Sequence, residues 1–157
     1  MRRIIHVLTI EHDFFARNWM AMLFARDWRT RIIGEVGSLD RLDAFAESCP
    51  DRVDMVLINT ASAPSRKQQA ALLKTLQHCS AQTRVIWLGD VADPAVFGWL
   101  PQERVAGYLL KSEIRYSLAW ALAIGQDQWG LTPGVQEAAF QAGFALPKHA
   151  AILDGTR

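Results

Sequence analysis

Short apolar runs alternate along the chain with segments whose apolar residues recur at helical spacing, and this alternation constrains the fold more than any other feature. Five such runs lie at residues 4–10, 31–36, 54–59, 84–89 and 105–110. Nearly uninterrupted, β-branched runs are typical of strands buried on both faces of a sheet. Because parallel strands need crossover connections and these are right-handed, the pattern predicts an α/β fold with a doubly wound, five-stranded parallel sheet.

Each run is followed by a segment with helical spacing. The expected helices begin near Phe14, Leu39, Arg66, Pro94 and Glu113. Four residues are expected to cap them by accepting hydrogen bonds from backbone N–H groups, namely Asp13, Ser38, Ser65 and Ser112.

Beyond the last expected helix the alternation stops. Thr132 and Pro133 predict the start of one short helix, because a capping residue is followed by proline in the first turn. Residues 144–157 show no periodicity. We therefore expect a folded domain over residues 1–126 and a linker or tail over residues 127–157 that contains this helix.

The composition indicates a folded protein, because 50% hydrophobic and 21% charged residues over 157 positions are close to the globular average. The formal net charge is +1, so charge alone does not indicate a nucleic-acid-binding surface. Cys49 and Cys79 lack metal-ligand spacing and are expected to be free thiols in a reducing compartment. The amino-terminal stretch resembles neither a signal peptide nor a membrane span, so we expect a cytoplasmic protein without membrane contact.

Doubly wound folds place their working residues at the carboxyl ends of the strands, beside the point where the strand order reverses. In this chain those positions are held by Glu11, His12, Asn59, Gly89 and Lys111. A functional site is therefore expected among these five residues.

Several stretches around the strand ends form a recognisable set: Val7–Asp13, Ile33–Val36, Asp54–Asn59 and Gly107–Ser112. In order and spacing they resemble the receiver domain of bacterial two-component response regulators, in particular the LuxR- or NarL-type subfamily, whose receivers precede a helix-turn-helix. The resemblance covers residues 3–126, and residues 129–135 resemble the segment that follows such receivers. It implies a flavodoxin-like, CheY-like fold of five strand–helix repeats with strand order 2-1-3-4-5.

The resemblance also implies the chemistry that these positions would carry. In receivers, two acidic residues after the first strand hold Mg²⁺, an aspartate ending the third accepts a phosphoryl group, a Ser or Thr ends the fourth, and a lysine ends the fifth. This chain instead has Glu11 and His12 as the acidic pair, Asn59 in place of the aspartate and Gly89 in place of the hydroxyl. Only Lys111 is kept.

These departures predict a degenerate phosphorylation site. A carboxylate can form an acyl phosphate, whereas the amide of Asn59 is uncharged and a poor nucleophile. Mg²⁺ prefers hard oxygen ligands, and exchanging carboxylates for His12 and an amide removes most of the charge that would hold it. Gly89 lacks the hydroxyl that responds to phosphate. We therefore expect no catalytic residue, no metal, no cofactor and no enzymatic activity.

We do not expect a nearby carboxylate to replace the missing acid. Asp13, Asp54 and Asp90 lie near these strand ends in sequence, but Asp54 begins its strand and Asp13 is better placed to cap a helix. His12 and Glu11 lack a third ligand at a spacing suited to a transition metal, which favours a solvated or hydrogen-bonded histidine. We expect Lys111 to form an ion pair with Glu11, of modest strength if exposed.

Four aromatic residues are candidates for an interface: Phe97, Trp99, Tyr108 and Trp120. They fall in the expected fourth helix, fifth strand and fifth helix, the face that receivers use for dimers and partners. Exposed aromatics dominate interface hot spots, but aromatics also fill cores, and both interpretations stay open for each residue. Our hypothesis is that Trp99 or Trp120 belongs to an exposed patch used for self-association.

The leading interpretation is an atypical, phosphorylation-independent receiver, a signalling and protein-interaction module in two-component or transcriptional regulation. It would form the amino-terminal part of a regulator that contacts DNA only through a carboxyl-terminal domain absent from this chain. Its partner would be another protein or a second copy, held by the face described above. The alternatives are a receiver that can still be phosphorylated and a sensor that binds a small anion or metabolite at Asn59, Gly89 and Lys111.

Overall fold

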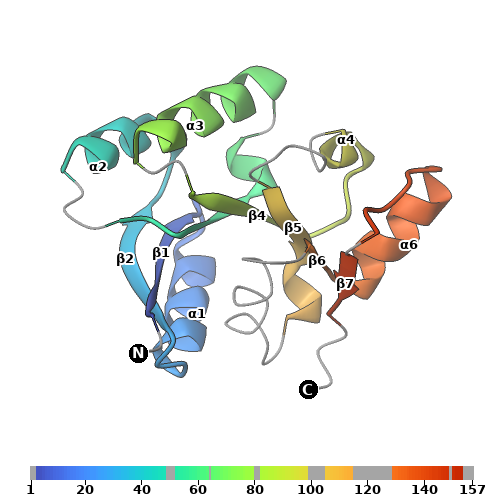
Figure 1. The fold of residues 1–157 in the computed structure, drawn as a ribbon, viewed down its shortest axis with the longest axis horizontal. Coiled ribbons are helices and arrows are strands. Elements are labelled where there is room, and N and C mark those ends of the chain that lie inside the picture. Colours follow the sequence, from blue (N-terminus) through green and yellow to red (C-terminus); the bar gives the residue numbers. More distant parts are fainter. Residues whose placement is uncertain are drawn as a thin grey trace. The chain divides into compact units, whose positions relative to one another are not determined.

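The computed structural model describes residues 3–48, 52–63, 65–79, 82–98, 105–114, 129–148 and 150–153 (Figure 1). The chain divides into two compact units, Met1–Thr83 and Arg84–Arg157. Each unit is built on parallel strands joined by helices, which confirms the predicted α/β class.

The first unit contains three parallel strands in the order β2-β1-β3. Its elements are β1 (Ile5–Ile10), α1 (Phe14–Ala25), β2 (Thr30–Val36), η1 (Leu39–Arg41), α2 (Leu42–Ser48), β3 (Met55–Asn59), η2 (Thr60–Ser62) and α3 (Arg66–Cys79). Helix α1 leads outward from β1 to β2, and α2 leads back across β1 to β3. Helix α1 lies on one face of these strands and α2 and α3 lie on the other (Figure 1), which is the arrangement expected of right-handed crossovers.

Strands β1 and β3 consist mainly of apolar residues, which suits strands that are buried on both faces. Every residue of β3 is buried, as are Val7, Leu8 and Ile10 of β1. The side chains on both faces of these strands therefore contact protein. This explains why apolar and polar residues do not alternate along them.

Most of the expected helix starts are confirmed. The Asp13 carboxylate accepts hydrogen bonds from Phe15 N at 2.8 Å and Ala16 N at 3.1 Å, so it caps α1. Ser65 and Gln68 form a reciprocal capping box at the start of α3, with both backbone-to-side-chain distances 3.2 Å. Among the described helices, none combines the length and apolar character needed to cross a bilayer.

Two of the four residues expected to cap helices are placed differently from the prediction. Ser38 precedes the 3-10 turn η1 and makes no capping hydrogen bond through its side chain, so that prediction was wrong. Ser112 lies within the 3-10 turn η3 (Lys111–Glu113). Most of the helix expected from Glu113 to Ile124 lies outside the described residues.

The described residues of the second unit form four parallel strands in the order β4-β5-β6-β7. Its elements are β4 (Arg84–Gly89), α4 (Pro94–Phe97), β5 (Val105–Leu110), η3, β6 (Trp129–Leu131), α6 (Pro133–Gln141) and β7 (Ala150–Ile152). The five predicted strands are all present at nearly their predicted bounds. The described residues form seven strands, however, so the prediction of a five-stranded sheet was wrong in number.

The two additional strands lie in the segment expected to be a linker or tail, residues 127–157. The short helix predicted there is present as α6, and the strands β6 and β7, which flank it, belong to the second unit's sheet. Two glycines permit the pairing of β5 with β6. A Cβ atom on Gly107 would lie 2.3 Å from the carbonyl oxygen of Gly130, which only a glycine can tolerate.

Side-chain hydrogen bonds join this segment to the end of β5. Thr132 Oγ1 accepts from Leu110 N at 2.9 Å, and the Glu113 carboxylate accepts from Gly134 N at 2.9 Å. The carboxylate thus lies at the amino end of α6, where the helix dipole favours negative charge. The Thr-Pro-Gly sequence that predicted a helix start therefore also fastens that helix to β5.

Candidate functional site

The carboxyl ends of β1 and β3 bring Glu11 and Asn59 together. The two strands are parallel neighbours, with Ile10 opposite Ile58, so the residues that follow emerge side by side. Asn59 Nδ2 donates to Glu11 Oε1 at 3.0 Å and to Oε2 at 2.8 Å. Both side chains are buried, with residue exposures of 0% for Glu11 and 2% for Asn59. Their contact is a buried, charge-assisted hydrogen bond.

Further contacts fix the orientation of both groups. Asn59 Oδ1 accepts from Ala61 N at 2.9 Å, which places the amide oxygen toward η2 and the amide nitrogen toward Glu11. Asp13 N donates to Glu11 Oε1 at 3.1 Å, and His12 Nδ1 lies 3.4 Å from the same oxygen. Nitrogen atoms from three residues therefore surround the carboxylate of Glu11.

This arrangement does not suit Mg²⁺, the ion that the resemblance implies. Magnesium requires several oxygen ligands in octahedral geometry. Here the Glu11 oxygens accept N–H groups, Asn59 turns nitrogen toward Glu11, and Asp13 caps α1. Across the part of the chain that the structure describes, three or more His, Cys, Asp or Glu side chains do not gather at any one place. An amide beside the carboxylate also avoids the repulsion between two facing acids that a cation would otherwise have to offset.

Asp54 lies at the opposite end of β3 from Asn59. Its carboxylate accepts from His6 N at 2.9 Å and pairs with Arg52, whose Nε is 3.2 Å away, and with Arg3. It therefore joins the starts of β1 and β3, as its place at the beginning of the run predicted.

In the second unit, Lys111 follows β5 and Asp90 follows β4. Lys111 Nζ lies 3.9 Å from Asp90 Oδ1, and the Asp90 side chain is largely exposed, so the pair contributes little to stability. The expected ion pair between Lys111 and Glu11 joins residues of different units and stays a prediction.

Gly89, at the end of β4, lies against the ring of Tyr108. The Tyr108 hydroxyl donates to Val91 O at 3.1 Å and accepts from Asp93 N at 3.0 Å, so it fastens the loop between β4 and α4. A Cβ atom on Gly89 would lie 3.1 Å from both the Tyr108 hydroxyl and Val91 O. Burial raises the pKa of the Tyr108 hydroxyl, although its hydrogen bond with the Asp93 backbone opposes this shift. Because Gly89 has no side chain, the buried ring of Tyr108 can lie directly against its backbone.

The sequence did not reveal this role of Tyr108, which it offered as an interface candidate together with Phe97. Both side chains are buried in the second unit and meet edge to face, with ring centroids 6.1 Å apart. Phe97 also stacks on Phe144 at 5.6 Å. The structure therefore favours the core interpretation for these two residues. Trp99 and Trp120, the other candidates, lie outside the described residues.

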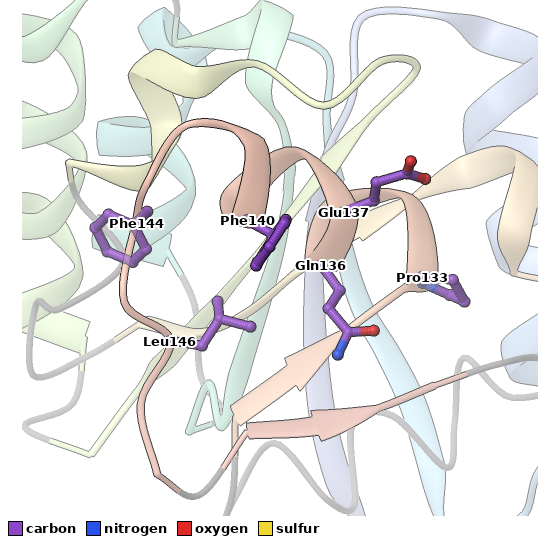
Figure 2. A pocket seen from close by; sticks show the side chains of 6 residues that line it. All are labelled: Pro133, Gln136, Glu137, Phe140, Phe144 and Leu146. Atoms are coloured by element: carbon purple, nitrogen blue, oxygen red, sulfur yellow. The ribbon is translucent and has the colours of Figure 1, made fainter.

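A groove of about 560 Å³ runs along α6 in the second unit (Figure 2). Its lining comes from α6 and from the segment that follows, and consists of Pro133, Gln136, Glu137, Phe140, Phe144 and Leu146. None of the residues predicted to form a site lines it.

Comparisons with solved structures identify the fold of this chain. No family model matches the sequence, and no curated protein sequence matches it. Among solved structures, the isolated receiver domain of RcsB from Salmonella enterica serovar Typhimurium, determined with the phosphomimetic BeF₃⁻, matches with a TM-score of 0.69 and 14% identity. The match covers 86% of this chain and 98% of that domain.

Two further structures support the same assignment. The receiver domain of the response regulator NarL from Mycobacterium tuberculosis matches with a TM-score of 0.62 and 19% identity, covering 80% of this chain and 99% of that one. The pilus assembly protein CpaE from Caulobacter crescentus matches with a TM-score of 0.57 and 21% identity, covering 78% and 92%. At these identities the likeness concerns the fold, and the fold of this chain is the flavodoxin-like fold of response regulator receivers.

Proposed function

We propose that this chain is a receiver that works without phosphorylation, and that it transmits a signal through contacts with other proteins and not through catalysis. The observation that carries the proposal is the hydrogen bond from Asn59 to the buried Glu11 carboxylate. It occupies the place where the resemblance implies an aspartate and a magnesium ion.

The chemistry of an amide supports this proposal. Phosphoryl transfer to a receiver needs a carboxylate oxygen as nucleophile, and the nitrogen of a carboxamide is a poor one because its lone pair is delocalised. Both polar atoms of the Asn59 amide also form hydrogen bonds: the nitrogen donates to Glu11, and the oxygen accepts from Ala61 N. The Glu11 charge is stabilised by N–H donors, so the site holds together with no need for a cation.

The environment of Gly89 supports a fixed state. No hydroxyl is available at this position to follow a phosphoryl group, and Tyr108 is fastened inward by two hydrogen bonds to the backbone. We therefore propose that the loop between β4 and α4 keeps a single conformation, which a partner could recognise regardless of phosphorylation.

The neighbours suggest a biological setting. RcsB from Salmonella is described bound to promoter DNA and as dimers on DNA. By analogy we propose a cytoplasmic role in transcriptional regulation, with DNA contacted by a separate domain. CpaE is a pilus assembly protein, so the fold also occurs outside DNA-binding regulators. The protein-interaction role is therefore the primary proposal, and transcriptional regulation is its expected context.

Beryllofluoride with Mg²⁺ tests this proposal, because it mimics a phosphoryl group on a receiver carboxylate. Thermal unfolding of the chain should be unchanged by saturating beryllofluoride and Mg²⁺, since a ligand that does not bind the native state cannot raise the midpoint. The isolated RcsB receiver, studied with this phosphomimetic, is the positive control. A raised midpoint for this chain that requires both beryllofluoride and Mg²⁺ would overturn the proposal.

A further inference from the structure

The amino ends of three neighbouring strands in the first unit bring arginines to one edge of the sheet. Two backbone hydrogen bonds join these strand starts: Ile5 N donates to Arg29 O at 2.8 Å, and Asp54 N donates to His6 O at 3.0 Å. Adjacent strands lie about 4.8 Å apart, so the three starts lie within about 10 Å. The end of α1 lies beside the starts of β1 and β2 (Figure 1). We call this set the arginine edge: Arg3, Arg26, Arg29, Arg31 and Arg52.

Two aspartates hold three of these arginines in place. Arg29 Nε donates to both carboxylate oxygens of Asp27, at 2.9 and 3.1 Å, and Asp54 pairs with Arg3 and with Arg52. The aspartate side chains are largely buried, with exposed fractions of 16% and 5%. The three arginine side chains are 39–58% exposed. The carboxylates therefore fix these arginines while leaving them accessible to a partner.

Arg26 and Arg31 exceed the local acids. Both are exposed, and among the described residues no carboxylate lies within ion-pair distance of either. The arginine edge thus carries five positive charges against the two of its aspartates, in a chain whose formal net charge is only +1. A local excess of one charge favours a partner surface of the opposite charge.

Exposed apolar side chains lie among these charges. Trp28, which falls between Arg26 and Arg31 in the sequence, is 63% exposed, and Ile4, which precedes β1, is 44% exposed. Tryptophan and arginine are the residue types most enriched at binding hot spots, whereas lysine is depleted from interfaces. The cations of the arginine edge are all arginines. This combination is typical of a protein-binding surface.

We propose that the arginine edge docks an acidic segment of a partner protein that also carries apolar side chains. Carboxylates of the partner pair with Arg26 and Arg31, and its apolar side chains cover Trp28. The planar guanidinium group matches a carboxylate through two parallel hydrogen bonds. Because aspartates already hold the other arginines, less side-chain entropy is lost when the partner binds.

A protein suits this surface better than a nucleic acid or an anionic membrane does. The chain as a whole is nearly neutral, so a long polyanion would be attracted only at this edge. Base stacking and membrane insertion each use several aromatic or apolar side chains. The described part of the edge offers Trp28 and Ile4. The proposal goes beyond the proposed function, which names no surface, and rests on it for the expectation of a protein partner.

Fluorescence anisotropy of a labelled acidic peptide, titrated with the full chain, tests the proposal. The probe is a synthetic peptide of glutamates interspersed with leucines and phenylalanines. Its dissociation constant should rise with salt concentration, because salt screens exposed charges. Arg26→Gln combined with Arg31→Gln should raise the dissociation constant at least about fivefold, and Trp28→Ala should raise it by a similar factor.

Arg41→Gln combined with Arg66→Gln is the matched control. It removes the same charge at exposed positions that follow the carboxyl ends of β2 and β3, at the opposite end of the strands. This pair should leave the dissociation constant unchanged. All these variants should keep the thermal unfolding midpoint of the natural sequence, because the substituted side chains are exposed.

Two further probes separate the other anionic partners: a single-stranded oligonucleotide of the same net charge as the peptide, and vesicles that contain phosphatidylserine. Both should bind more weakly than the peptide. Failure of the peptide to bind at low salt, equal weakening by the control pair, or tighter binding of the oligonucleotide or the vesicles would each overturn the proposal. None of these outcomes affects the beryllofluoride test, which concerns the carboxyl ends of the strands.

Discussion

Asn59 donates its amide nitrogen to both oxygens of the buried Glu11 carboxylate, at 3.0 and 2.8 Å. The pair joins the carboxyl ends of two adjacent parallel strands and leaves one negative charge where two facing acids would need a cation. The hydrogen bond therefore holds these two strand ends together. In the function that we propose, it also makes this edge unsuited to covalent phosphate chemistry.

Restoring the acid should therefore destabilise the protein. Asn59→Asp places a second carboxylate against Glu11 and should lower the free energy of unfolding at neutral pH by about 3 kcal/mol, because like charges are then buried together. The deficit should be smaller in mildly acidic solution, where protonation of one carboxyl group removes the repulsion.

Urea unfolding at neutral and mildly acidic pH measures this effect. Asn18→Asp adds the same charge at an exposed position on α1 and should change the free energy of unfolding by about 0.5 kcal/mol or less. An Asn59→Asp variant as stable as the natural sequence at neutral pH would show that the hydrogen bond to Glu11 has no part in holding the two strands.

Adding a side chain to Gly89 should disturb the tyrosine beside it. Gly89→Ser should cost about 1–3 kcal/mol in the free energy of unfolding, because the new Cβ would lie 3.1 Å from the Tyr108 hydroxyl and from the Val91 carbonyl oxygen. Gly37→Ser is the control, since its Cβ would meet the flexible Arg17 side chain at 3.3 Å. Equal costs for the two variants in chemical unfolding would contradict the tight packing at Gly89.

Tyr108 should make the stability depend on alkaline pH. Burial holds the pKa of its hydroxyl above the ordinary value of 10.0, so the unfolded chain loses this proton before the folded one does. The stabilisation is complete below the unfolded pKa and decreases as the pH rises toward the folded pKa. Tyr108→Phe should remove this part of the pH dependence.

The same variant should lower the free energy of unfolding at neutral pH by about 1–3 kcal/mol, because Val91 O and Asp93 N lose their shared partner. Unfolding curves recorded across the alkaline range for both proteins measure the two effects. If the alkaline decline were identical in the natural sequence and in Tyr108→Phe, the tyrosine would not be its source.

The pairing of β5 with β6 depends on backbone contact at Gly107. Gly107→Ala should lower the free energy of unfolding by about 3 kcal/mol or more, since its Cβ would lie 2.3 Å from a backbone oxygen that cannot rotate away. Hydrogen exchange should report increased opening of β6 and β7 in this variant. Wild-type stability and protection would mean that the segment after residue 128 does not pair with β5.

The sequence was most informative where one pattern extended over six or seven residues. The runs that became β4 and β5 were long, apolar and bounded by turns, and both strands have the predicted bounds, Arg84–Gly89 and Val105–Leu110. Asp13 and Ser65 were readable as caps because their chemistry is local. Strands β6 and β7 have three residues each, too few for a period to appear, and their pairing depends on a contact between Gly107 and Gly130 that lies far along the sequence.

The candidate site was predicted as a set of positions but not as a set of contacts. Asn59 was recognised as an amide in place of an acid, yet its hydrogen bond to Glu11 depends on the parallel register of β1 and β3. For Tyr108 the sequence left an interface role and a core role open, because a strand buried on both faces and one with an outward aromatic look alike in sequence. Its two loop contacts became visible only in the folded chain.

Intact-mass spectrometry after incubation with Mg²⁺ and a small phosphoryl donor, with the RcsB receiver treated in parallel, tests the central claim most directly. The account predicts that this chain keeps its original mass under conditions that modify the control. A stable gain of one phosphoryl group, located by peptide mapping at the strand ends that carry Glu11 or Asn59, would contradict it.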